Sequence, residues 1–79
     1  MIQDLTLTPV RVGTGTTDEE GRLVFAGSLL VAVLVHLAEG HDKAGQWFLE
    51  HGFGKLDVPV PPTFSDLRAA ENWIVGRLN

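Results

Sequence analysis

The sequence feature that most constrains the fold is the apolar stretch RLVFAGSLLVAVLVHLAEG, which covers residues 22–40. A helix that spans a membrane needs about 20 consecutive apolar residues. The apolar run in this stretch extends only from Leu23 to Ala38, and Gly27 and Ser28 interrupt it. Because the run is both short and broken, we expect no membrane span and no membrane partner.

A hairpin explains the same stretch better than a buried helix. The run is rich in valine, a β-branched residue, and has a glycine near its middle, which weakens a helix. A Gly-Ser pair between two apolar arms is typical of a type II′ turn, in which glycine takes the first central position. We therefore predict strands at roughly 21–26 and 29–38, joined by a turn at Gly27-Ser28. This turn would pair Ala26 with Leu29, Phe25 with Leu30 and Val24 with Val31.

The segments on either side of the hairpin also have extended patterns. Apolar residues alternate in DLTLTPVRV (4–12), and Pro9 lies where the alternation changes phase, which predicts a bulge or an edge strand. The segment QWFLEHGFG (46–54) reads as a further strand. Three prolines within 55–62 exclude a helix there and predict an extended connection.

The C-terminal segment has the pattern of an amphipathic helix over residues 65–78. Ser65 or Thr63 can cap its N-terminus, and Arg77 in the last turn complements the helix dipole. One apolar stripe repeats at helical spacing and would face a sheet. The stripe consists of Leu67, Ala70, Ile74 and Leu78.

These elements predict a single α+β domain over residues 1–79, with a small antiparallel sheet of three to four strands and one C-terminal helix packed on one face. The segments GQWFLEHGFG and TFSDLRAAENWI, joined by the proline-rich connection, resemble small uncharacterised bacterial α+β proteins. This resemblance covers about the last forty residues and implies the same order of strand and helix. Because those proteins have no assigned activity, it transfers no functional residue.

The strand predicted at 29–38 is apolar on both sides. Side chains alternate along a strand, so Val31, Val33 and Val35 would share one face, and Leu30, Ala32 and Leu34 the other. We expect the helix to cover the valine side, although either side is possible. The remaining face would then need the N-terminal arm of the chain or a second copy of the chain to cover it.

This uncovered face leads to the functional hypothesis, a non-enzymatic protein-interaction module that binds a protein partner or forms a homodimer. The expected interaction surface is Leu30, Leu34, Phe48 and Phe53. The net charge is −4 and the six basic residues are scattered, so we expect no nucleic-acid partner. The N-terminus MIQDLTLTP lacks the pattern of a signal peptide, which favours a cytoplasmic location.

Motifs for catalysis or cofactor binding are weak. The segment VRVGTGTT (10–17) resembles the start of a dinucleotide-binding turn, but Asp18 stands where the third glycine is needed, and two further acids follow it. Ser28 and Ser65 already have structural roles in the predicted turn and helix cap. We therefore expect no enzymatic activity and no cofactor.

The alternative hypothesis is a small-molecule or metal-binding domain. If the turn at 39–45 is centred near Lys43, His36 and His51 would lie opposite each other on paired strands, with Trp47 between sheet and helix. Glu39, His41 and Asp42 would add donors at the turn. The spacing of these groups matches no known metal-ligand pattern, so we expect no bound metal.

Overall fold

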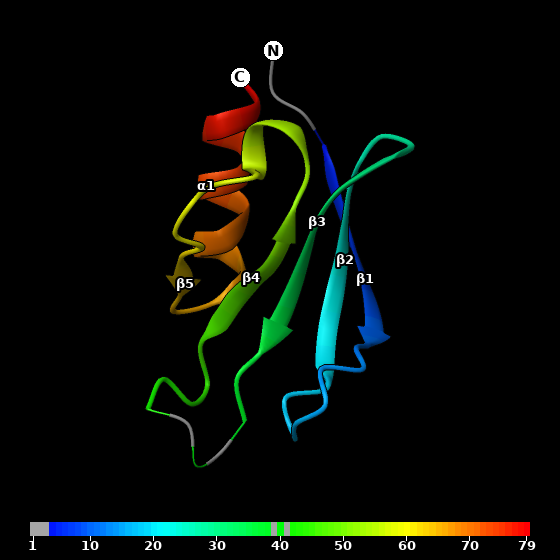
Figure 1. The fold of residues 1–79 in the computed structure, drawn as a ribbon. Helices are drawn as coiled ribbons and strands as arrows, with labels where there is room; N and C mark the ends of the chain where they lie inside the picture. Colours follow the sequence, from blue (N-terminus) through cyan, green and yellow to red (C-terminus); the bar gives the residue numbers. More distant parts are fainter. Residues whose placement is uncertain (1–3, 39, 41) are drawn as a thin grey trace.

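A computed structural model of the chain describes residues 4–38, 40 and 42–79 and shows a five-stranded antiparallel sheet with one helix against it (Figure 1). The strands follow one another in the sheet in chain order, from β1 at one edge to β5 at the other. The elements are β1 (Leu5–Arg11), β2 (Glu20–Ala26), β3 (Leu29–His36), β4 (Trp47–Gly52), the 3₁₀ helix η1 (Gly54–Leu56), β5 (Thr63–Phe64) and α1 (Leu67–Leu78).

The predicted hairpin is confirmed. Strands β2 and β3 are joined by Gly27 and Ser28, and of these two only Gly27 has a positive φ, at 64°, as a type II′ turn requires. The pairs next to the turn, Ala26–Leu29 and Phe25–Leu30, are also as predicted. The third predicted pair is wrong, because a bulge intervenes and Val24 pairs with Ala32.

This bulge changes which residues of β3 share a face. Val24 and Phe25 are consecutive in β2 and point to opposite faces, so their partners Ala32 and Leu30 do so too. The prediction that Leu30, Ala32 and Leu34 share one face is therefore wrong. Leu30 lies on the opposite face, because the extra residue of the bulge restarts the alternation.

The helix covers the face that carries Ala32 and Leu34, and not the side of Val33 and Val35 as we expected. The three valines do not share one face either, because Val31, the extra residue of the bulge, packs against the core cluster. We call the side of the sheet under the helix the helix face and the other side the second face. The buried cluster on the helix face draws residues from both halves of the chain. It consists of Val24, Ala32, Leu34, Trp47, Leu49, Leu56, Phe64, Ala70 and Ile74.

A second bulge lies between β3 and β4. Leu34 pairs with Leu49 but Val33 pairs with His51, so Glu50 is the extra residue. Just beyond it, η1 turns back over the end of β4, and a Cβ atom on Gly52 would lie 2.0 Å from the carbonyl oxygen of Leu56. Glycine at 52 therefore allows Leu56 to reach the core, where it is fully buried.

The sheet has five strands and not the three to four that we predicted. The additional strand is β5, whose two residues pair with Trp47 and Phe48 of β4. The backbone N–H of Leu49 also donates to the carbonyl oxygen of Pro62, 3.1 Å away. A proline can take part in this contact because it still offers its carbonyl group.

The C-terminal helix begins at Leu67, two residues after the predicted start. Asp66 caps it, with a carboxylate oxygen that accepts from the N–H of Ala69 at 2.8 Å, in place of the predicted Ser65 or Thr63. The predicted apolar stripe is confirmed. Ala70 and Ile74 are buried, and Leu67 and Leu78 pack against the core cluster.

None of the helices in the described ranges 4–38 and 42–79 is both long enough and apolar enough to cross a membrane.

Candidate functional site

The second face of the sheet is the surface to which the functional hypothesis points. Its residues follow from the register of the strands, and Phe53 extends it, because the Phe53 ring lies 4.5 Å from the ring of His51. The second face consists of Thr6, Thr8, Val10, Leu23, Phe25, Leu30, Val33, Val35, Phe48, His51, Phe53 and Thr63. No residue of this set carries a carboxylate, an ammonium or a guanidinium group, but the charged residues Asp18, Lys43 and Glu50 line a cavity with Val35 and Phe48.

Much of the second face is apolar and only partly shielded from solvent. Leu30 is 36% exposed and Phe53 is 44% exposed. Leu23 and Phe25 on β2 and Val33 on β3 belong to the same face, and each is half-buried. A sheet normally buries its apolar face against a second layer, and α1 supplies such a layer on the helix face only.

Three of the four residues predicted for the interaction surface lie on this face, namely Leu30, Phe48 and Phe53. The fourth, Leu34, is a correction, because it is 0% exposed and belongs to the core under the helix. The bulge after Val24 separates Leu34 from Leu30, and no feature of the sequence marks its position.

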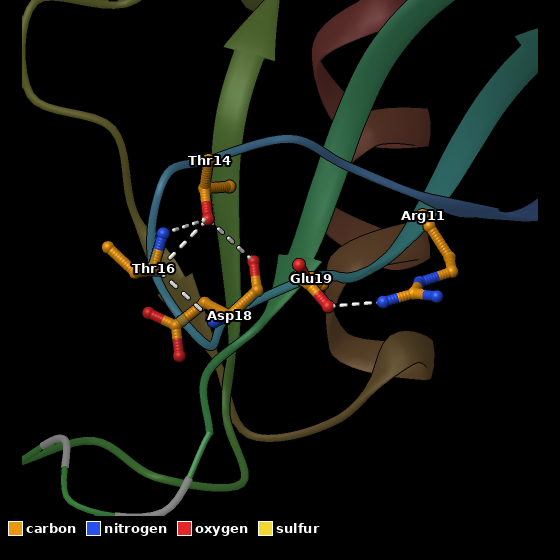
Figure 2. A network of polar contacts seen from close by, with 5 residues as sticks. All are labelled: Arg11, Thr14, Thr16, Asp18 and Glu19. Carbon is orange, nitrogen blue, oxygen red and sulfur yellow. Dashed lines mark hydrogen bonds and ion pairs between the residues drawn. The ribbon is translucent and has the colours of Figure 1, made fainter.

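One end of the second face is covered by the loop between β1 and β2, residues 12–19, which hydrogen bonds between its own side chains and backbone hold in shape (Figure 2). The Thr14 hydroxyl donates to the carbonyl oxygen of Asp18 at 3.0 Å and accepts from the N–H of Thr16 at 3.3 Å. The Thr16 hydroxyl in turn accepts from the N–H of Asp18 at 3.1 Å. Glu19 forms an ion pair with Arg11 at the base of the loop.

Asp18 also ties the loop to the end of β3. Its carboxylate oxygen accepts a hydrogen bond from the N–H of Ala38 at 2.6 Å, across twenty residues of sequence. The loop borders an open cavity of about 480 Å³ whose apolar lining includes Val35, Leu37 and Phe48. Val35 and Leu37 are buried although no helix lies on this side.

The residues of the alternative ligand site are not all brought together. His36 pairs with Trp47, and their ring centroids are 4.8 Å apart. His51 pairs instead with Val33 on the second face, so the prediction that His36 and His51 lie opposite each other is wrong. The register of the two strands causes the difference, because His36 faces Trp47, four residues before His51. The extra residue Glu50 only moves His51 from a position opposite Ala32 to one opposite Val33, on the second face.

Sequence reasoning missed Arg22, which lies beside Trp47. The Arg22 guanidinium carbon is 5.0 Å from the centre of the Trp47 ring, and the guanidinium donates to Glu20 at 3.3 Å and to the carbonyl oxygen of Gly21 at 2.9 Å. His36 Nδ1 lies 3.8 Å from the other carboxylate oxygen of Glu20. The alternation of Glu20 and Arg22 in one strand could have indicated that their side chains meet.

Within the described part of the chain, no three histidine, aspartate or glutamate side chains are placed to hold a metal ion together. Of the three turn residues that we considered as donors, Glu39 and His41 lie outside the described residues, and Asp42 is exposed. The loop network was missed as well. Its signal is the spacing Thr14, Thr16, Asp18, because short hydroxyl and carboxylate side chains bond to backbone two residues away.

Comparison of the chain with protein-family models, with curated proteins and with solved structures found no match.

Proposed function

We propose that this protein is a non-enzymatic interaction module that associates with a second copy of itself through the second face of its sheet. The observation that carries this proposal is the partly exposed apolar surface that includes Phe25, Leu30 and Phe53, on the side of the sheet opposite α1. Apolar surface left in water forgoes about 25 cal/mol for each Å², so a second layer over these side chains stabilises the chain.

The charge distribution favours a second copy as the occupant. In an association through identical surfaces, each charged group near the symmetry axis meets a like charge. The chain as a whole has a net charge of −4, but the paired positions of the second face carry no charged side chain apart from the ionisable His51. Asp18, Lys43 and Glu50 lie around the cavity at its loop end. The second face is therefore a surface on which two copies can approach without strong repulsion.

The size of the face sets the expected strength. Four strands at about 4.8 Å spacing, each about seven residues long, give a footprint of roughly 19 Å by 23 Å, or about 440 Å² per copy. Stable protein interfaces bury about 800 Å² on each partner. We therefore expect a weak association, populated at tens to hundreds of micromolar.

A matched pair of variants tests the proposal. Leu29 and Leu30 are adjacent exposed leucines, but Leu29 pairs with Ala26 and Leu30 with Phe25, so they lie on opposite faces. Sedimentation equilibrium of the wild type, Leu29→Glu and Leu30→Glu from about 1 to 300 µM is the measurement. The wild type and Leu29→Glu should associate alike, and Leu30→Glu should associate at least tenfold more weakly, because only its charge enters the interface.

Circular dichroism and thermal unfolding establish that both variants are folded. A wild type that stays monomeric over the whole range would contradict the proposal. Equal association of Leu29→Glu and Leu30→Glu would contradict it as well.

A further inference from the structure

Strand β1 forms one edge of the sheet, and its outer side has no neighbouring strand in the described part of the chain (Figure 1). The opposite edge is β5, which has only two residues, whereas β1 has seven. An edge strand presents unpaired N–H and C=O groups that can bond to another strand. Because β1 is longer, its edge offers a partner strand more backbone groups than the edge of β5 does.

The register identifies which groups of β1 point outward. The N–H of Val12 donates to the carbonyl oxygen of Glu19 at 2.8 Å, and the pairing continues without a shift from Arg11–Glu20 to Leu5–Ala26. Bonded pairs alternate along an antiparallel ladder. The even-numbered residues of β1 thus bond to β2, while the N–H and C=O groups of Leu5, Leu7 and Arg11 face the open side.

Pro9 is also odd-numbered, so the N–H that it lacks would have been on the open side. Proline at this position leaves the bonds to β2 intact, which is why the strand tolerates it. At the same time it removes one donor from the outer ladder. A partner strand that ran past Pro9 would leave one of its own carbonyl groups without a donor.

From this arrangement we propose that the edge of β1 pairs antiparallel with β1 of a second copy, in a register centred on Thr6. Leu5 then faces the partner's Leu7, and Thr6 faces the partner's Thr6. Four backbone hydrogen bonds form between the outward groups of the two leucines in each copy, and Pro9 lies beyond them. The alternation Leu-Thr-Leu-Thr makes the strand complementary to itself, since threonine pairs and leucine pairs are both favourable across strands.

The surroundings of the edge agree with this occupant. In the proposed register Asp4 faces the partner's Thr8. Neither Asp4 nor Arg11 therefore faces the same residue of the partner, and no like charges are brought together. Leu5 and Leu7 are half-buried on the helix face, and the partner's leucines would extend that apolar layer. Because the symmetry axis is perpendicular to the sheet, the two second faces come to lie side by side and form a surface twice as large.

Amide hydrogen exchange measured residue by residue at about 5 and 500 µM tests the edge contact separately from the second face. Exchange at Leu5 and Leu7 should slow at least fivefold at the higher concentration. Thr6 and Thr8 are internal controls, because their N–H groups are already bonded to β2. Contact through the second face alone leaves the Leu5 and Leu7 amides in water, so equal exchange at the two concentrations would overturn the edge proposal.

Two proline variants complete the test. Leu7→Pro removes one outward N–H, as Pro9 does naturally, and should weaken edge association at least tenfold while the sheet persists. Pro9→Thr restores an outward donor and should leave association equal or stronger. Unchanged association of a folded Leu7→Pro chain would overturn the proposal, and if that variant does not fold, the exchange measurement on the wild type decides. Leu30→Glu weakens the contact through the second face only, so the association that remains in this variant is through the edge and should still protect Leu5 and Leu7.

Discussion

The carboxylate of Asp18 accepts a hydrogen bond from the backbone N–H of Ala38 at 2.6 Å, which joins the loop between β1 and β2 to the end of β3. The two residues come from separate connections at the same end of the sheet. This contact holds the loop over Val35 and Leu37, both of which are buried without help from the helix. A single carboxylate thus fixes the layer that covers this end of the second face.

Asp18→Ala is expected to release the loop. The lost bond has a charged acceptor, and such bonds contribute about 1.5–3 kcal/mol to the free energy of unfolding. Urea unfolding measures the loss, and amide exchange at Ala38 should become faster. Asp18→Asn is the control, because it keeps an oxygen acceptor and should lose less than Asp18→Ala. Equal stability of Asp18→Ala and the wild type would show that the contact does not hold the loop.

The bulge after Val24 is tested by a second pair of leucines. Leu34 is 0% exposed beneath the helix, whereas Leu30 is 36% exposed on the second face. Leu34→Ala should lower the free energy of unfolding by about 3 kcal/mol, because it leaves a cavity in the core. Leu30→Ala should lower it by less than about 1 kcal/mol. Thermal unfolding of the monomeric chain at low concentration measures the loss of stability in each variant. Similar losses in Leu34→Ala and Leu30→Ala would contradict the pairing of β2 with β3, which places these two leucines on opposite faces.

The sequence was sufficient to predict the elements that depend on local chemistry. The turn at Gly27-Ser28 follows from the need for a positive φ, and the face of α1 follows from the spacing of Ala70 and Ile74. The choice of cap could not be predicted, because Ser65 and Asp66 are neighbours and both are good capping residues.

The faces of the sheet could not be predicted, for a different reason. A strand with polar residues on one side reveals its register, but Leu29–Val35 is apolar throughout, so a bulge within it changes no visible pattern. This difficulty separated Leu30 from Leu34, whereas His51 and His36 are apart because His36 faces Trp47 and the pairing is not centred near Lys43. The short elements η1 and β5 could not be predicted because they depend on contacts distant in sequence, η1 with α1 and β3, and β5 with β4. Such contacts leave no periodic signal.

Gly52 is expected to be intolerant of any side chain. A Cβ atom there would lie 2.0 Å from the carbonyl oxygen of Leu56 and 2.6 Å from its carbonyl carbon, so the backbone itself would have to move. Gly52→Ala should cost about 3 kcal/mol or more, as overpacking in a rigid site does. Gly76→Ala is the matched control. Gly76 lies in α1, a Cβ atom there meets no neighbour within 4 Å, and alanine should stabilise the helix by about 0.5–1 kcal/mol. Chemical denaturation of both variants measures their free energies of unfolding. If both variants are less stable than the wild type, or both more stable, the prediction is wrong.

The last prediction concerns Arg22 and Trp47. The side chain of Arg22 is only 20% exposed, and its guanidinium lies over the Trp47 ring, which is itself buried. Arg22→Ala should open the ring to water, shift its fluorescence to longer wavelength and lower stability by about 1 kcal/mol. The measurement needs a Trp73→Phe background, so that Trp47 alone emits. Arg22→Lys keeps the charge and the aliphatic chain but loses the planar group, so its emission should lie between those of the wild type and Arg22→Ala. If Arg22→Ala emits at the same wavelength as the Trp73→Phe background, the guanidinium does not shield the ring from water. The side chains of Glu20, Arg22 and Trp47 then do not pack together.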